Sequence, residues 1–463
     1  MNRLPPELIA LCATFVSCTD PRPIVTLTHV CRYWYRSITS GQRNWASIGS
    51  GWKRLVPLCL ERAGSVPLTV KISAPDIARD EGFLQALIPH VSRISDLSLT
   101  GYSSMKNAED KLPGFFSPMP NLTSLELGQT EWLAKSFPLD ETPTLPILQN
   151  VSKLKSLHLT RVPLYSTLFH IQSLVELKLT DYTIPFGKFV GFLEPNVALE
   201  IVILRLSFIK GSVWTVPERT VSLPRLRYLA LSFDYENGIG ARGLFSCLSF
   251  PRTAFVEVHV VSSPRGSDFF LASFLPHPPT SIHELLAHTT TIKYQDSPRE
   301  VHISGNGGSF SFYTPITPSK IYEEFDPFTT SAVRELHLRP NRIDRKDLAS
   351  HLPQALEQLP MLEALALSQA SLCPGSLSAL SKEPLLCRSL KTIALIECPG
   401  TRDVITELEE IATKREHSTL ARLHRVVIVN DRYELPDSRS IKNLRRLVPH
   451  VDVMVGDELP DLL

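Results

Sequence analysis

Three short Glu-x-His units are the residues of this 463-residue chain whose types and spacing best suit chemistry. They are Glu257 with His259, Glu300 with His302, and Glu335 with His337. Residues two apart point to the same face of a β-strand, and imidazole changes its charge near neutral pH. Stacked in register on neighbouring strands, the units would form adjacent columns of three glutamates and three histidines. This arrangement predicts a target-binding patch with pH-dependent charge or a weak metal site; a solvated polar face is the alternative without function. We carry the six residues forward as candidate target-binding residues and assign no metal.

Two other patterns come close to cofactor or catalytic motifs. Residues 238–243 fit G-x-G-x-x-G, but a dinucleotide fold needs this motif near the start of a βαβ domain. His283 and His288 nearly form H-E-x-x-H, yet a separation of five residues takes them off the shared helix face that zinc requires. There is no G-x-S-x-G and no Walker lysine loop. We therefore expect a protein without catalytic residues or cofactors. A nucleotide- or metal-dependent enzyme is a remote alternative.

The elements that must position the Glu-x-His units are short apolar segments that recur along most of the chain. The unit reads Leu-x-x-Leu-x-Leu at 122–127, 154–159 and 174–179, and related copies run from Leu97 to Val453. Their mean spacing is about 30 residues, at the long end of the leucine-rich-repeat range, in which each strand is followed by a helix or an irregular return. Residues 344–359 and 401–416 read as amphipathic return helices. The pattern predicts an α/β fold in which residues 66–463 form an irregular leucine-rich-repeat solenoid.

The repeat geometry also predicts which side chains are available to a partner. The spaced leucines point into the solenoid, whereas the residues between them point out from the concave face of parallel strands. Such a surface suits protein recognition better than a small-molecule pocket. The widest steps between repeats contain Gly305-Asn-Gly-Gly-Ser309 and proline-rich stretches, so we expect long loops near 261–330.

The first fifty residues contain a second kind of apolar pattern. Leu4, Leu8, Leu11, Cys12 and Phe15 follow helical spacing, and the stretch 20–23 interrupts that helix. A further apolar set begins at Ile24. About 45 residues form a marginal core unaided, so a helical module of this size is expected to leave an apolar patch for a partner.

These residues resemble the F-box family. The segments that match it in order and spacing are Leu-Pro-Pro-Glu-Leu-Ile at 4–9, Phe15-Val16, Pro23-Ile24, Leu27, Val30-Cys31-Arg32, Trp34 and Trp45. The flanking stretch 61–68 is similar to that of F-box proteins of mushroom-forming fungi. The resemblance covers residues 1–50 and departs from the family at Asn44, where an apolar residue is usual.

The resemblance implies a three-helix F-box over residues 1–50, followed by a linker helix over 51–65. An F-box docks on the Skp adaptor, which connects it to cullin and RING subunits. The residues implied to bind the adaptor are Leu4, Pro5, Leu8, Ile9, Leu27, Val30 and Trp34, whereas Trp45 is expected in the core. The chain would then be the substrate-recognition subunit of a Skp–cullin–F-box ubiquitin ligase, with the repeats binding a target protein. A scaffold that engages the adaptor without ubiquitination is the alternative.

Bulk properties narrow the partners and the compartment. The net charge of +1 gives no general basic field for nucleic acid or an acidic membrane, and no apolar run reaches the length of a bilayer span. The apolar stretch 8–16 superficially resembles a secretory signal, but Pro5, Pro6 and Glu7 interrupt the approach to it. The eight cysteines lack C-x-x-C spacing, as in a reducing compartment. We therefore expect a cytoplasmic or nuclear protein that binds neither nucleic acid nor membrane.

Overall fold

The fold is described from a computed structural model of the whole chain. The described residues are 4–17, 22–73, 82–101, 119–128, 151–161, 171–182, 186–206, 220–233, 238–260, 280–296, 299–305, 309–313, 332–339, 352–369, 375, 377–381, 386–398, 401–418, 421–430 and 438–455. The chain divides into two compact units, Met1–Ser212 and Val213–Leu463, and each is described by itself.

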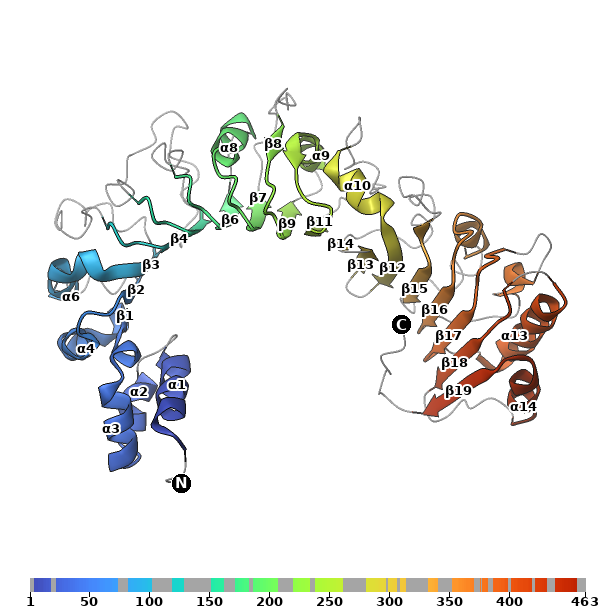
Figure 1. Cartoon of the computed structure of the whole chain (residues 1–463), viewed down its shortest axis with the longest axis horizontal. Coiled ribbons are helices and arrows are strands. Elements are labelled where there is room, and N and C mark those ends of the chain that lie inside the picture. Colours follow the sequence, from blue (N-terminus) through green and yellow to red (C-terminus); the bar gives the residue numbers. More distant parts are fainter. Residues whose placement is uncertain are drawn as a thin grey trace. The chain divides into compact units, whose positions relative to one another are not determined.

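The N-terminal unit begins with helices and continues with strands (Figure 1). Its helical elements are α1 (Pro6–Ser17), α2 (Arg22–Thr28), α3 (Arg32–Ser40), η1 (Gln42–Trp45), η2 (Ser50–Leu55), α4 (Val56–Ala63), α6 (Gly82–Leu87), η3 (Ile88–Arg93) and α8 (Phe186–Leu193). Its strands are β1 (Ser47–Gly49), β2 (Leu68–Ser73), β3 (Ile94–Thr100), β4 (Ser124–Gly128), β5 (Ser156–Thr160), β6 (Glu176–Tyr182) and β7 (Ile201–Leu206).

Helices α1, α2 and α3 pack on one another around a small apolar core. Ile9 in α1, Ile24 in α2 and Ile38 in α3 are buried in it. Trp45 is buried as expected, and its indole Nε1 donates to the Ile38 carbonyl at 3.2 Å. The buried Asn44 also donates to that carbonyl, from Nδ2 at 3.1 Å, so the polar residue that departs from the family pattern closes the end of α3.

Strands β1 to β7 pair in chain order, and every pair is parallel. Alternate side chains of each strand point to one face, which we call the core face, and are buried there; in β4 these are Leu125 and Leu127. Each such leucine contributes roughly 1.5–3 kcal/mol on burial. The residues between them lie on the opposite face, called the second face below. The stretch 51–65, expected as a linker helix, contains most of η2 and all of α4. Strand β1, which precedes this stretch, pairs with β2, which follows it.

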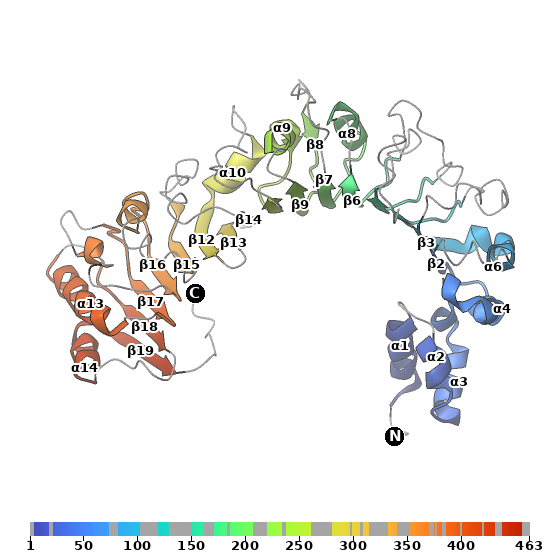
Figure 2. The same ribbon diagram turned by 180° about the vertical axis from the view of Figure 1, so that it is seen from behind.

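The C-terminal unit has the same alternation of strands with helices or irregular returns (Figures 1 and 2). Its strands are β8 (Val221–Ser222), β9 (Tyr228–Phe233), β10 (Leu248–Ser249), β11 (Phe255–Val260), β12 (Thr289–Asp296), β13 (Arg299–Gly305), β14 (Ser309–Tyr313), β15 (Glu335–Arg339), β16 (Ala364–Ser368), β17 (Thr392–Ile396), β18 (Arg425–Asn430) and β19 (His450–Val455). Its helical elements include α9 (Gly238–Cys247), α10 (Ser281–Ala287), η11 (Ser378–Leu380), α13 (Thr401–Glu416) and α14 (Ser438–Leu447). The return helix predicted over 401–416 is therefore present with the same bounds, and 352–357 of the one predicted over 344–359 are helical.

The main sheet of this unit contains an insertion that the repeat pattern does not predict. Strand β11 pairs in parallel with β14, and β12 pairs in parallel with β15, while β13 lies antiparallel between β14 and β12. Part of the segment expected as long loops therefore forms a three-stranded meander, so that expectation is wrong for 289–296 and 309–313. The strand expected around Glu300 and His302 is present as β13. Other residues of the segment, such as 261–279 and 314–331, lie outside the described ones.

Gly305 explains how β13 ends against its neighbours. A Cβ at this position would collide with the backbone carbonyl of His288, the residue that links α10 to β12. Glycine is therefore required for close approach of two backbones and not only for a flexible loop.

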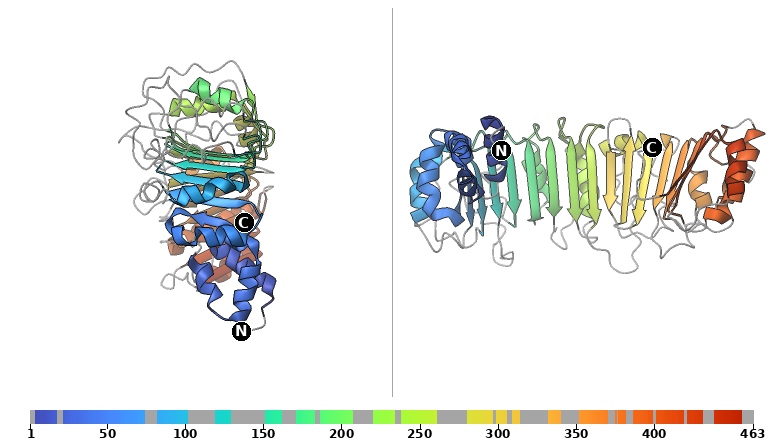
Figure 3. Two further views of the ribbon diagram at one scale, coloured as in Figure 1. Left: turned by 90° about the vertical axis from the view of Figure 1, so that its left-hand side faces the viewer. Right: turned by 90° about the horizontal axis from the view of Figure 1, so that it is seen from below.

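From β15 to β19 the strands pair in parallel and in chain order, as they do in the N-terminal unit (Figure 3). The predicted α/β class with parallel strands is thus confirmed. Helices α13 and α14 pack on each other beside these strands, and their buried side chains include Leu408, Ile411 and Leu444.

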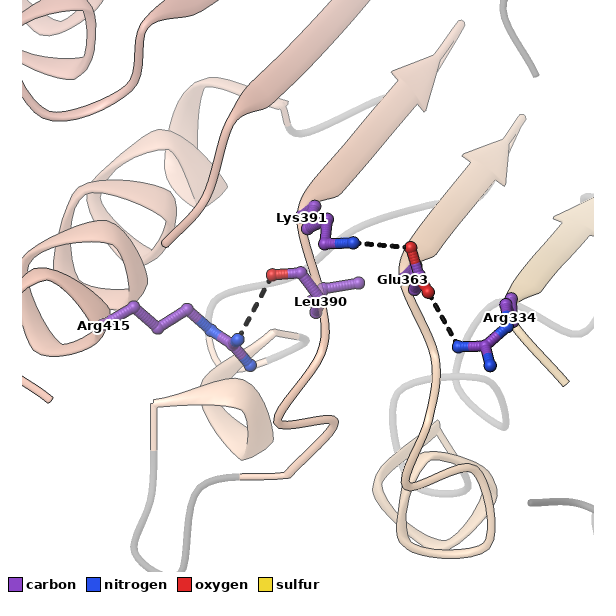
Figure 4. A network of polar contacts seen from close by, with 5 residues as sticks. All are labelled: Arg334, Glu363, Leu390, Lys391 and Arg415. Atoms are coloured by element: carbon purple, nitrogen blue, oxygen red, sulfur yellow. Dashed lines mark hydrogen bonds and ion pairs between the residues drawn. The ribbon is translucent and has the colours of Figure 1, made fainter. Parts of the chain in front are cut away.

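Arg415, in the last turn of α13, is the largest fully buried side chain among the described residues (Figure 4). Its Nη2 donates to the carbonyls of Leu386 at 2.8 Å and Cys387 at 3.0 Å, and its Nη1 donates to Leu390 at 3.3 Å. Burial raises the pKa of the adjacent Cys387 thiol to about 12, so that thiol stays neutral. Arg415 thus supplies hydrogen bonds to the irregular segment before β17, whose buried carbonyls would otherwise lack donors.

A second polar network in Figure 4 crosses the segments that lead into β15, β16 and β17. Glu363 accepts from Arg334 Nη1 at 2.7 Å and from Lys391 Nζ at 2.8 Å. The hydrogen bond from Lys391, followed by its charge and the contacts of Arg334, lowers the pKa of Glu363.

Replacing Glu363 with glutamine is expected to destabilise the chain by less than about 1 kcal/mol, because all three side chains are partly exposed to water. Urea unfolding at low and at high salt measures this difference. The loss should shrink as salt rises, and a loss of several kcal/mol would show that the network is more than a screened surface contact.

Candidate functional site

The most concentrated apolar surface among the described residues lies on the N-terminal helices. Seven large apolar side chains of the described residues are exposed, and five of them belong to the first 35 residues. These five, called the N-terminal apolar patch below, are each 46–52% exposed: Leu4, Leu8, Leu11, Val30 and Tyr35. Isolated exposed apolar residues need no explanation, but a group confined to one small module is typical of a protein-binding surface.

The patch follows from the helical geometry of the segment. Leu4, Leu8 and Leu11 are spaced i, i+4 and i+7, which places them along one stripe of a helix. Just before α1, the carbonyl of Leu4 accepts a hydrogen bond from the Tyr33 hydroxyl at 2.9 Å. Because Tyr33 belongs to α3, this bond ties the start of the stripe to a separate helix.

The residues implied to bind an adaptor do not all lie on this patch. Pro5 is exposed together with Leu4, Leu8 and Val30, and Leu27 and Trp34 are half-buried. Ile9 is fully buried, so its placement toward a partner is wrong. Consecutive helical residues are about 100° apart, and the turn that exposes Leu8 sends Ile9 into the core.

Leu11 and Tyr35 are exposed residues that sequence reasoning did not single out for this surface. The spacing of Leu11 from Leu8 was the available signal for the first. No pattern in the sequence marks Tyr35, because its exposure depends on how α3 is rotated against α1.

A second candidate site lies on the second face of β9 and β11, where Glu257 and His259 meet. His259 Nε2 lies 2.6 Å from Glu257 Oε1, and the Tyr228 hydroxyl donates to the other carboxylate oxygen. The Tyr228 ring stacks on Phe255 with ring centroids 5.4 Å apart. Burial, followed by the hydrogen bond to Glu257, raises the pKa of Tyr228 to about 12. The site thus combines two aromatic rings, a carboxylate and an imidazole, a composition suited to protein recognition.

Glu335 and His337 on β15 have a different arrangement. Glu335 Oε2 accepts a hydrogen bond from the Thr291 hydroxyl at 3.0 Å and lies 4.0 Å from His337 Nε2. That distance is too long for a hydrogen bond, and His337 Nε2 is buried without a hydrogen-bond partner among the described residues. Burial, with a smaller effect of the Lys293 charge, lowers the pKa of His337 to about 4.

The expected adjacent columns of three glutamates and three histidines are wrong. Strand β14 lies between β11 and β13, and β12 lies between β13 and β15. Strand β13 is antiparallel to its neighbours, which reverses the order of its residues across the sheet. His302 lies opposite Ser311, which in turn lies opposite Glu257. Glu300 lies opposite Tyr313, which lies opposite His259. The side chains of Glu300 and His302 lie outside the described residues.

His337 leads to a prediction about the pH dependence of stability. Its pKa is about 4 in the folded chain and 6.5 ordinarily, so between these values the unfolded chain binds a proton that the folded chain does not. Stability is therefore expected to fall, by at most about 3 kcal/mol from this group, as the pH drops from about 6.5 to about 4.

Urea unfolding at several pH values in this window measures the effect. The His337→Gln variant should lose most of this dependence, whereas His424→Gln, which alters an exposed histidine of the same unit, should keep it. Equal pH dependence in all three proteins would contradict the assignment.

The N-terminal unit contains a related cluster on its second face that sequence reasoning missed. Ser156 Oγ donates to Glu176 Oε2 at 3.0 Å, and His158 Nε2 lies 3.1 Å from Glu176 Oε1 and 3.4 Å from the serine oxygen. In a catalytic triad the carboxylate holds one ring nitrogen of the histidine, and the other ring nitrogen accepts the proton of the serine. Here Glu176 and Ser156 both lie next to Nε2 of His158, so the three residues do not form a catalytic triad. The available signal was the place of these residues between the spaced leucines of two neighbouring repeat units.

The near-matches to catalytic motifs have structural explanations. Residues 238–243 lie within helix α9, so their glycines do not form a phosphate-binding turn between strand and helix. His283 closes the N-terminus of α10, where its Nδ1 accepts from the backbone N–H of Thr280 at 3.2 Å. His288 follows the other end of that helix.

The described residues contain no group of three or more histidine, cysteine, aspartate or glutamate side chains that could hold a metal ion. No described helix has both the length and the apolar character needed to cross a bilayer. The chain matches no family model, and no curated protein matches its sequence.

Proposed function

We propose that this chain is a non-catalytic substrate-recognition subunit of a Skp–cullin–F-box ubiquitin ligase. In this proposal residues 1–50 are an F-box that binds the Skp adaptor, and residues 66–463 are a leucine-rich-repeat-like domain that binds a target protein. The observation that carries the proposal is the N-terminal apolar patch, together with the F-box-like sequence of the same residues.

The exposure of the N-terminal apolar patch supports binding of a protein partner. Each side chain keeps about half of its surface in water, although a core of buried isoleucines lies directly beneath. Burial of apolar surface is worth about 25 cal/mol per Å², so five such side chains provide a driving force for association. Tyr35 is of a residue type enriched at the centre of protein interfaces, and the three leucines and Val30 add apolar area around it.

The parallel strands support the second half of the proposal. In each unit parallel strands hold polar side chains on the second face, namely Ser156, His158 and Glu176 in one and Tyr228, Glu257 and His259 in the other. We assign target binding to the second of these clusters and keep Glu300 and His302 on β13 and Glu335 and His337 on β15 as further candidates. The chain would then act by bringing its target near the ubiquitin-charged enzyme, which raises the effective concentration of the reactants without any chemistry by its own side chains.

Affinity purification tests this function. The intact chain is expressed with the adaptor, cullin and RING subunits, beside a variant carrying Leu4→Ala and Pro5→Ala. The intact chain should retain adaptor and cullin, and the variant should lose both while keeping other partners, which are then candidate targets. Recovery of the adaptor without cullin would favour a scaffold that does not promote ubiquitination. Full retention of the adaptor by the variant would contradict the proposal.

Target binding needs its own measurement. Alanine at His259 is expected to lower target capture, because it removes the imidazole partner of Glu257. The matched control is His424→Ala, which removes an exposed histidine outside this cluster. Equal capture by both variants would exclude the cluster from target binding.

A further inference from the structure

Helix α14 (Ser438–Leu447) carries exposed charges of a single sign. Its exposed cations, called the basic face below, are Arg439, Lys442, Arg445 and Arg446. Successive helical residues are about 100° apart, so the four side chains fall within roughly 120° of the helix circumference. On the opposite side of the helix, Ile441 and Leu444 are buried in the chain. The helix is therefore amphipathic, and the charges that it presents to water are all positive.

No acidic side chain of this part of the chain balances the basic face. Residues 438–450 contain no aspartate or glutamate, and neither do residues 421–430, which lead into and form β18. None of the four cations forms an ion pair with a described residue. The carboxylate of Asp452 on β19 is held by Arg425, and that of Glu410 on α13 by Lys414. Because the whole chain has a net charge of only +1, the basic face is a local excess of charge.

This charge distribution is unfavourable for the helix itself. Arg439 lies in the first turn, where the helix dipole favours negative charge, and no acidic residue is present there. Lys442 precedes Arg445 by three positions and Arg446 by four, so like charges lie side by side on the helix surface. Among the described strands β19 pairs with β18 alone, and the last repeat of such an array needs a polar outer face. Mixed charges would supply that polarity without repulsion, so polarity alone does not account for four cations.

We propose that the basic face of α14 binds an acidic segment of a partner protein. An α-helix rises 1.5 Å per residue, so Arg439 and Arg446 are separated by about 10 Å along the helix axis. Three residue steps of an extended chain cover a similar distance, about 10 Å, so four consecutive acidic residues match the length of the face. Arginine guanidinium groups bind carboxylates through paired hydrogen bonds, and three of the four cations are arginines.

The surroundings of the basic face favour a protein partner over a membrane or a nucleic acid. The apolar side of α14 is buried in the chain, so the helix has no apolar face to insert into a bilayer. Single-stranded nucleic acids are held by aromatic side chains on which bases stack, and residues 438–450 and 421–430 contain no phenylalanine, tyrosine or tryptophan. The inference does not rest on the proposed ubiquitin-ligase function, because the face belongs to the C-terminal unit and needs no adaptor.

Fluorescence anisotropy of the intact chain without an adaptor tests the inference. The probe is a fluorescein-labelled peptide of eight alternating aspartate and glutamate residues, and the same peptide with asparagine and glutamine should not bind. Combined replacement of Arg439, Lys442 and Arg446 with glutamine should weaken binding at least about tenfold, because the attraction is lost with the charges. Negligible binding of the acidic peptide to the intact chain would overturn the proposal.

The matched control removes three exposed cations elsewhere in the same unit. Combined Arg225→Gln, Arg242→Gln and Arg252→Gln gives the same change in net charge and should weaken binding less than about twofold. Equal weakening by both triple variants would show that the peptide responds only to net charge and would overturn the proposal. A short DNA duplex and vesicles containing phosphatidylserine are titrated in the same salt. If either bound more tightly than the peptide and lost binding with the α14 variant, the partner would belong to that class instead.

A cross-linking measurement on the unaltered chain keeps the test decisive if the α14 variant does not fold. A carbodiimide joins carboxylates of the N-acetylated acidic peptide to lysine amines nearby, and mass spectrometry identifies the lysine. Lys442 should be the preferred position, and Lys188, an exposed lysine on helix α8 of the N-terminal unit, is the matched control. Equal coupling at Lys442 and Lys188 would overturn the assignment of the peptide to α14.

Discussion

Under the proposed function, replacing Leu8 with aspartate is expected to abolish binding of the Skp adaptor while leaving the fold intact. Leu8 lies within the N-terminal apolar patch and is 46% exposed, so a carboxylate at this position stays hydrated in the free protein. In a complex the same carboxylate would be buried against apolar surface without a partner. A loss of about 3–4 kcal/mol is expected, which weakens binding roughly 150- to 1000-fold.

The measurement is a titration of the purified adaptor against each variant. Met361→Asp is the matched control, because Met361 is an exposed apolar residue of the other unit and should not affect adaptor binding. Ile9→Asp has a different expected outcome: it places a charge in the core of α1–α3 and should unfold the helices. If Leu8→Asp bound the adaptor as tightly as Met361→Asp, the patch would not be the docking surface.

Replacing Arg415 with methionine is expected to destabilise the C-terminal unit by about 3–5 kcal/mol, because several buried carbonyls lose their donor at once. Methionine keeps most of the side-chain volume, so the loss reports on hydrogen bonds more than on a cavity. The neighbouring Cys387 thiol cannot replace the guanidinium, because a thiol is a weak hydrogen-bond donor. The backbone carbonyl of Cys387 is one of the acceptors that would lose its donor.

Thermal and urea unfolding measure this loss, and the midpoint temperature should drop by about 10 °C. Arg422→Met is the matched control, since Arg422 is exposed and its replacement should change stability by less than about 0.5 kcal/mol. A similar, small effect of both substitutions would mean that water or backbone adjustment replaces the hydrogen bonds of Arg415.

The ladder of parallel strands was predictable because its signal is local. Leu125 with Leu127 and Leu365 with Leu367 occupy alternate positions, and each pair identifies a strand and its buried face without knowledge of its neighbours. Strands β12 and β14 have apolar residues at alternate positions, Ile292 with Tyr294 and Phe310 with Phe312, but they were missed because they lack the spaced leucines of the repeat unit. The segment 289–296 is rich in β-branched and aromatic residues, which favours a strand but does not reveal its direction.

The candidate sites, like the fold, could be predicted from the sequence only in part. The apolar stripe of α1 could be read from spacing, but the burial of Ile9 depends on the rotation of the helix against α3. The positions of Glu257, Glu300 and Glu335 were known, whereas their relative placement depends on which strands separate them. Pairing partners are set by contacts far apart in sequence, and short motifs carry no information about them.

The meander β12–β14 adds three strand widths to the sheet, about 14 Å, without changing the direction in which the chain continues. This follows from its odd number of strands: β12 and β14 each run parallel to the neighbour they meet, so β11 and β15 keep the same sense on either side. An inserted hairpin of two strands would reverse that sense, so that β15 would run antiparallel to β11. The meander is therefore a self-contained spacer, and a shortened chain in which β11 meets β15 directly would conserve every other pairing of the sheet.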